Sequence, residues 1–202
     1  ALSSVGLAFC GMHFFGAFQK IGSLHAKSKI GLLLSGLHFV FAVMHGVMAV
    51  GIFFFLENLK VFYIFLFVSH LLLTIAAMLG IYLVFYILSP GVSSWPATII
   101  VLLLGSVLIL MTIVAPPHPF VDAGGGLDFN FSRPISVLLG YLLFIGIGSF
   151  FVIFTHSFLR GKLREVRTIS FILAALAAIG IVNVLFRFLL PINIDPEFLF
   201  IR

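Results

Sequence analysis

Long uncharged runs of apolar residues are the feature that most constrains this chain. Several runs are longer than the core of a water-soluble domain requires, and a helix needs about 20 apolar residues to cross the hydrocarbon layer of a bilayer. Of the 202 residues, 62% are hydrophobic and 8% are charged, a composition typical of integral membrane proteins. The sequence therefore predicts an all-α protein embedded in membrane lipid.

The apolar runs predict a bundle of six transmembrane helices that form one domain over residues 1–202. Basic or Pro- and Gly-containing segments such as KSK, SPGVSSWP and RGKLREVR separate them. The predicted spans are 1–19, 30–56, 61–88, 97–115, 134–159 and 168–190. The longest polar segment, 116–133, is shorter than a soluble domain of roughly 50 residues. We therefore expect any chemistry to take place in the membrane or at its edge.

The distribution of Lys and Arg predicts how the chain is oriented. The first and fifth loops carry most of the basic residues: Lys20, Lys27 and Lys29, then Arg160, Lys162, Arg164 and Arg167. The second and fourth loops carry one each, Lys60 and Arg133. Because cytoplasmic loops are enriched in Lys and Arg, we expect both termini on the outer side of the cell (inner or plasma) membrane. This pattern of short basic loops excludes nucleic acid as a partner.

Histidine is the residue type that points to function. The predicted spans contain no deeply placed Asp, Glu or Lys, which argues against a carboxylate-driven pump or a cation-coupled transporter. Four histidines, His13, His38, His45 and His70, fall in the first three predicted helices. At 1.5 Å per residue, His45 and His70 lie about 16 and 13 Å from the outer ends of their helices, and His13 and His38 lie about 8 and 12 Å from the inner ends. The histidines thus form two pairs of similar depth.

Two imidazoles at one depth on facing helices are what axial ligation of a b-type haem requires. We expect at most one haem, between the second and third helices, because irons bound at His38 and His45 would lie only about 10.5 Å apart. His45 with His70 is the better pair, and His13 with His38 is the other. In layout alone this resembles the b-haem anchor subunits of respiratory dehydrogenases, which implies electron transfer within a complex of membrane subunits.

A quinone is a further expected partner. Its pocket would need a polar rim near one interface, and His156 with Thr155 and Arg160 offers one on the cytoplasmic side.

On the outer side, Arg187 lies about one turn from the end of the last predicted helix, where it is expected to snorkel to the interface.

Metal chemistry other than haem stays open. His45 and Met48 are three residues apart, with Met44 and Met78 nearby in the same helices, and imidazole with thioether suits copper(I). The single cysteine, Cys10, excludes an internal disulfide and Cys-rich zinc or iron–sulfur sites.

Two further functions are compatible with the sequence. A sensor or transporter without haem would use the outer loop PPHPFVDAGGGLDFNFSRP for recognition, and Asp122 with Asp128 offers oxygen ligands for a hard cation. Without such a role, that loop is expected to be an irregular connection at the interface. A purely structural subunit would use its histidines for interhelical hydrogen bonds, each worth about 1 kcal/mol.

Small residues four apart predict close contacts between the helices. The pairs are Gly31/Ser35, Ala42/Gly46, Ala76/Gly80 and Ala174/Ala178. The 26 phenylalanines are expected to face lipid and to fill space between helices rather than to build an aromatic site.

Overall fold

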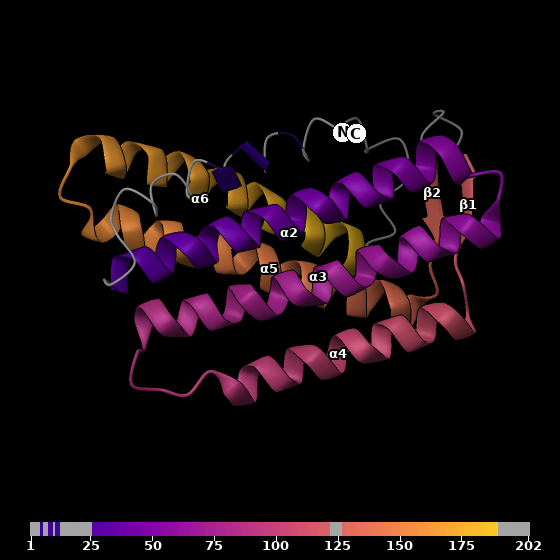
Figure 1. The fold of residues 1–202 in the computed structure, drawn as a ribbon, viewed down its shortest axis with the longest axis horizontal. Helices are drawn as coiled ribbons and strands as arrows, with labels where there is room; N and C mark the ends of the chain where they lie inside the picture. Colours follow the sequence, from indigo (N-terminus) through magenta and orange to yellow (C-terminus); the bar gives the residue numbers. More distant parts are fainter. Residues whose placement is uncertain (1–4, 6–7, 10, 13–25, 122–126, 190–202) are drawn as a thin grey trace.

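The computed structural model describes residues 5, 8–9, 11–12, 26–121 and 127–189. They form a bundle of long helices with a small β-hairpin at one end (Figure 1). The helices are α2 (Ala26–Phe55), α3 (Leu59–Leu88), α4 (Trp95–Val114), α5 (Arg133–Arg160) and α6 (Arg164–Val184), and α6 continues into a π-helical turn, η1 (Leu185–Leu189). Among the described residues, five helices are long and apolar enough to cross a membrane. The prediction of a mainly helical protein with several helices of membrane-spanning length is confirmed.

Five of the predicted spans coincide with these helices to within a few residues at each end. The remaining predicted span, 1–19, lies mostly outside the described residues, so a total of six helices stays a prediction. The described residues of that span, among them Gly11 and Met12, are helical. The hydroxyl of Ser35 donates a hydrogen bond of 2.8 Å to the carbonyl of Gly11, which places this part of the chain against α2.

The helices begin and end at residues suited to those positions. Pro96 and Pro134 lie in the first turns of α4 and α5, where the missing N–H of proline would have no partner within the helix in any case. The side chain of Asn58 caps α3 by accepting a hydrogen bond of 3.4 Å from the N–H of Val61. Residues near the helix ends thus help to set where these helices begin.

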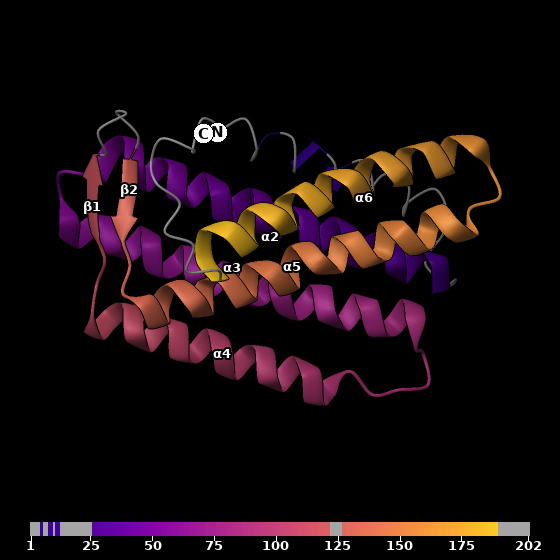
Figure 2. The ribbon, with the colours of Figure 1, turned by 180° about the vertical axis from the view of Figure 1, so that it is seen from behind.

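α3 and α5 are the inner helices of the bundle: α3 packs against α2, α4 and α5, and α5 packs against α3, α4 and α6. α2, α3 and α4 form one layer of the bundle, and α5 and α6 lie behind it (Figures 1 and 2). The core is made of fully buried aliphatic side chains from several helices, such as Leu37, Leu73, Leu83, Leu108 and Leu142.

Small residues set the closest approaches between helices. Ala76 is fully buried, and a Cβ added at Gly80 would lie 2.8 Å from the hydroxyl oxygen of Ser149 on α5, as the predicted pair Ala76/Gly80 requires. A Cβ added at Gly105 on α4 would overlap the side chain of Thr74 on α3. The contact at Gly105 was not part of the sequence prediction, because the residues four positions away, Val101 and Ile109, are not small.

The connection between α4 and α5 is a β-hairpin, so the expectation of an irregular connection is wrong. β1 (His118–Val121) pairs antiparallel with β2 (Leu127–Asn130), in a register that sets His118 opposite Asn130. The ring of Phe129 stacks on that of Phe62 in α3, with centroids 5.7 Å apart and an interplanar angle of 5°. Asp122 lies outside the described residues, so the cation site of Asp122 and Asp128 stays a prediction.

The two ends of the bundle differ in what they carry. The hairpin lies at the same end as the α2–α3 connection, and the α3–α4 and α5–α6 connections lie at the opposite end (Figures 1 and 2). The hairpin end therefore lies over the C-terminal half of α2 and the N-terminal half of α3, where His45 and His70 are found.

Candidate functional site

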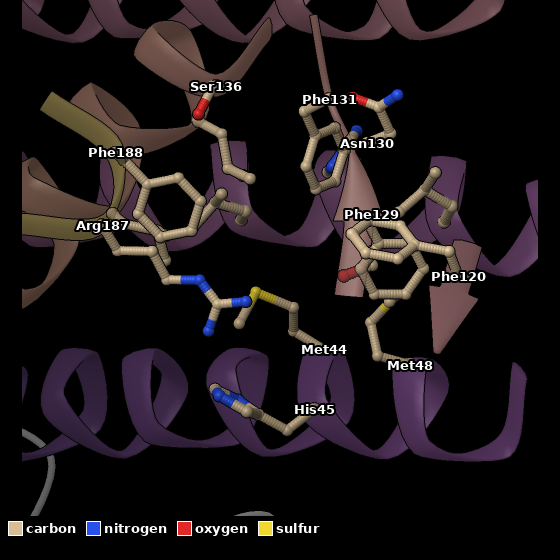
Figure 3. Close-up of a pocket in the computed structure, with 16 residues that line it drawn as sticks. Met44, His45, Met48, Phe120, Phe129, Asn130, Phe131, Ser136, Arg187 and Phe188 are labelled. Carbon is tan, nitrogen blue, oxygen red and sulfur yellow. The ribbon is translucent and has the colours of Figure 1, made fainter. Parts of the chain in front are cut away.

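A cavity of about 580 Å³ lies at the hairpin end of the bundle, and we name it the hairpin cavity. Its walls come from α2, α3, α5, η1 and both strands of the hairpin (Figure 3). The volume is in the range of small-molecule sites, which are mostly apolar with a few polar groups. The lining residues are Met44, His45, Met48, Leu66, Ser69, His70, Leu73, Phe120, Phe129, Asn130, Phe131, Ser136, Leu139, Leu143, Arg187 and Phe188.

The structure brings His45 and His70 to the wall of this one cavity. They come from neighbouring antiparallel helices that are in direct contact, since a Cβ added at Gly51 on α2 would lie 2.8 Å from the Cβ of Phe65 on α3. Space for a ligand therefore opens beside the α2–α3 pair, toward α5 and the hairpin, rather than between the two helix axes.

The hydrogen bond of His45 fixes its tautomer. Nδ1 lies 2.8 Å from the carbonyl oxygen of Phe41, one helical turn earlier. Because a carbonyl oxygen can only accept, Nδ1 carries the proton and donates it. In the neutral ring, Nε2 then keeps a lone pair that can bind a proton donor or a metal.

His70 is held in the same tautomer by a different helix. Its Nδ1 lies 3.2 Å from the hydroxyl oxygen of Thr112 on α4, and that hydroxyl donates its own proton to the carbonyl of Leu108 at 2.8 Å. The Thr112 oxygen therefore accepts from Nδ1, and Nε2 of His70 keeps its lone pair. His70 is only 3% exposed, so its ring orientation is set by packing as well as by this bond.

The other predicted histidines lie elsewhere. His38 is buried in α2, where its Nδ1 donates to the carbonyl of Leu34 at 2.7 Å and its ring meets Phe150 edge-on at 4.8 Å. It is not among the residues that line the hairpin cavity. His13 lies outside the described residues, so the pair of His13 with His38 stays a prediction. His156 is half-buried in α5, near the opposite end of the bundle from the hairpin.

Two methionines share the cavity with the two histidines. Met44 and Met48 both line it (Figure 3), and they add thioether sulfurs to the two imidazoles. Met78, the other predicted sulfur ligand, packs against the hydrophobic core. In the part of the chain that the structure describes, no three His, Cys, Asp or Glu side chains gather. A metal bound to both histidines would therefore complete its coordination with other ligands, such as thioether or a macrocycle.

Arg187 is among the residues that line the hairpin cavity. Its guanidinium extends from η1 toward Met44 and His45 (Figure 3), and the expected snorkelling to the interface stays a prediction. The guanidinium also lies 5.7 Å from the centroid of the Phe188 ring. A π-helical turn is wider than an α-helical one and changes where each side chain points, and such turns are frequent at functional sites. The sequence carries no clear signal of this turn.

The hairpin supplies site residues that the sequence prediction missed. Phe120, Phe129 and Phe131 line the cavity, so these three phenylalanines form an aromatic wall rather than filler. Asn130, also from the hairpin, and Ser136 from α5 add polar groups to the lining. The alternation of apolar and polar residues in LDFNF is a strand signal that could have placed this wall in advance.

The chain matches no family model, no curated protein and no solved structure. Its function is therefore argued from the geometry of the hairpin cavity.

Proposed function

We propose that this protein is an integral membrane subunit of a redox complex and that its hairpin cavity holds one b-type haem. The observation that supports this most is that His45 and His70 line the same cavity, each with Nδ1–H donated to a fixed acceptor. Metal-binding histidines have this arrangement almost always, because the second hydrogen bond orients the ring and sets its tautomer.

The residues around the cavity have distinct roles in this proposal. Haem would supply the one-electron chemistry, and the protein would set its potential through ligands and burial. His45 and His70 would hold the haem iron, and Phe129 and Phe131 would exclude water from one side. Arg187 provides a positive charge for a carboxylate, and a haem has two of these in its propionates. This donor set and these apolar walls fit the cofactor.

The proposal also includes the orientation and the partners. Six spans with both termini outside would place the hairpin cavity on the outer side of the cell membrane. The end of the bundle away from the hairpin carries four basic residues in and beside its α5–α6 connection, namely Arg160, Lys162, Arg164 and Arg167, and cytoplasmic loops are enriched in such residues. Electrons would be exchanged with a partner subunit or with a quinone.

The absorption spectrum of the purified full-length chain, oxidised and then reduced in detergent with added haem, tests the proposal. We expect a reduced b-type band at about one haem per chain. His45→Ala and His70→Ala should each lower the haem content at least about tenfold, since each removes one axial ligand. His156→Ala is the matched control, because this histidine is half-buried in α5 and does not line the cavity.

Three outcomes would contradict the haem proposal. They are the absence of a band after haem titration of folded protein, an equal loss in His156→Ala, and full haem retention in both cavity variants. If copper(I) is bound by His45, His70 and Met48 instead, the spectrum has no b-type band. Elemental analysis would then find copper in the native protein and less copper in Met48→Leu. Circular dichroism of every variant distinguishes lost ligation from lost folding.

A second function is favoured by Arg187. A guanidinium in a cavity of aromatic side chains, with Asn130 and Ser136 in the same lining, suits an organic anion with an aromatic or aliphatic body. The protein would then be a membrane-embedded sensor or transporter without haem. In that case Arg187→Gln would abolish ligand binding, whereas His70→Ala would leave it largely intact.

A further inference from the structure

A second cavity, of about 480 Å³, lies where α5 joins α6, at the end of the bundle away from the hairpin. We name it the α5–α6 cavity. It is lined by Phe158, Lys162, Arg164, Arg167, Thr168 and Phe171. Three of these six side chains are cationic, and the other three are two aromatic rings and one hydroxyl.

None of the residues that line this cavity is acidic. Glu165, which directly follows Arg164 in the sequence, is not among the lining residues. The guanidinium of Arg167 lies 5.3 Å from the centroid of the Phe158 ring, a cation–π contact that positions the group. The cavity is therefore a concentrated, partly ordered positive site.

One side of the cavity is apolar and faces outward. Phe171 is 58% exposed, and Ile169 and Ile172 nearby on α6 are 58% and 51% exposed. α6 is one of the helices long and apolar enough to cross a membrane, so in a membrane these exposed side chains would face lipid. A cationic cavity next to an apolar helix face matches a phospholipid of the adjacent leaflet, whose charged headgroup is likewise followed by apolar acyl chains.

We infer that the α5–α6 cavity binds the headgroup of an anionic phospholipid, with one acyl chain lying along the exposed face of α6. Arginine offers paired donors that match a phosphate, and lysine adds a point charge. Basic pockets between membrane helices are suited to such headgroups. This inference is independent of the haem proposal, because the two cavities share no residue.

Native mass spectrometry of the full-length chain in detergent, titrated with phosphatidylglycerol or phosphatidylcholine, tests the inference. We expect one phosphatidylglycerol to bind at least tenfold more tightly than phosphatidylcholine. Arg167→Gln should lower the affinity for phosphatidylglycerol about tenfold. Arg160→Gln is the matched control, because Arg160 carries the same charge at the end of α5 but does not line the cavity, and its effect should stay within twofold.

Each alternative predicts a different result. An equal loss in Arg160→Gln and Arg167→Gln would show a diffuse effect of net charge and overturn the inference. Displacement of the lipid by an equal concentration of inorganic phosphate would show a site for a free anion and would also overturn it. Phe171→Ala is the second variant: it should weaken binding of long-chain phosphatidylglycerol and leave binding of a six-carbon-chain analogue unchanged. If Phe171→Ala leaves the affinity for both lipids unchanged, the acyl chain does not lie along α6 at Phe171, and that part of the proposal is wrong.

Discussion

At the scale of single residues, buried polar side chains in this bundle are satisfied mainly within their own helices. The hydroxyls of Thr74, Thr112 and Ser149 each donate to the carbonyl four residues earlier, at 2.7 to 2.9 Å. A hydroxyl used in this way can still accept, as Thr112 does from His70. Side-chain hydrogen bonds between different helices are therefore few among the described residues, and the bond from His70 to Thr112 is one that joins α3 to α4.

Gly105 gives a prediction at this scale. Gly105→Ala should destabilise the protein by about 1–3 kcal/mol, because the new methyl group would overlap Thr74 and force α3 and α4 apart. The unfolding midpoint in detergent measures this. Gly148→Ala on α5 is the control, since no atom lies within 4 Å of its added Cβ, and it should be neutral or stabilising by up to about 1 kcal/mol. Similar midpoints for the two variants would disprove the close α3–α4 contact.

At the scale of elements, the helices could be predicted from sequence and the shorter elements could not. The spans from 30–56 to 168–190 are marked by hydropathy and by Pro, Gly and basic residues, which act locally. The number of residues between each histidine and the outer end of its helix also predicted that His45 and His70 lie at a similar depth, and both line the same cavity. The hairpin has only the short alternating stretch LDFNF as a local signal and depends on pairing across the 122–126 segment, and η1 depends on tertiary packing, so hydropathy alone predicted neither element.

The hairpin gives a prediction at the element scale. Phe129→Ala should remove the stack on Phe62, which is fully buried, and loosen the hairpin over the cavity. A stacked pair is worth about 0.5–1.5 kcal/mol beyond the area it buries, so amide hydrogen exchange in the 116–133 peptide should accelerate about tenfold. Phe120→Ala is the control on the same hairpin, where the ring is 48% exposed. Equal exchange in both variants would show that the stack does not hold the hairpin.

At the scale of the whole molecule, the two ends of the bundle carry opposite kinds of surface. One end has the hairpin cavity, with its aromatic wall and two histidines. The other has the cationic α5–α6 cavity. Under the proposed orientation, the cationic end lies on the cytoplasmic side, as basic loops usually do.

Orientation can be measured with single cysteines in a Cys10→Ser background. Glu57→Cys, in the α2–α3 connection, should react with a membrane-impermeant maleimide on intact cells. Ser93→Cys, in the α3–α4 connection, should react only after permeabilisation. Both native residues are exposed, so access to each thiol depends on its side of the membrane. The reverse pattern would place the hairpin cavity on the cytoplasmic side and contradict the proposed topology.

The position of the hairpin relative to α5 has a mechanical consequence. Only Phe131 and Ser132 separate the end of β2 from the start of α5. α5 then runs for 28 residues without interruption, a rod of about 42 Å, to Arg160 at the edge of the α5–α6 segment. A rod of this kind transmits tilt and rotation rather than absorbing them. α5 also lines the hairpin cavity with Ser136, Leu139 and Leu143, so a ligand that tilted α5 at this cavity would also move Arg160 at the other end of the bundle.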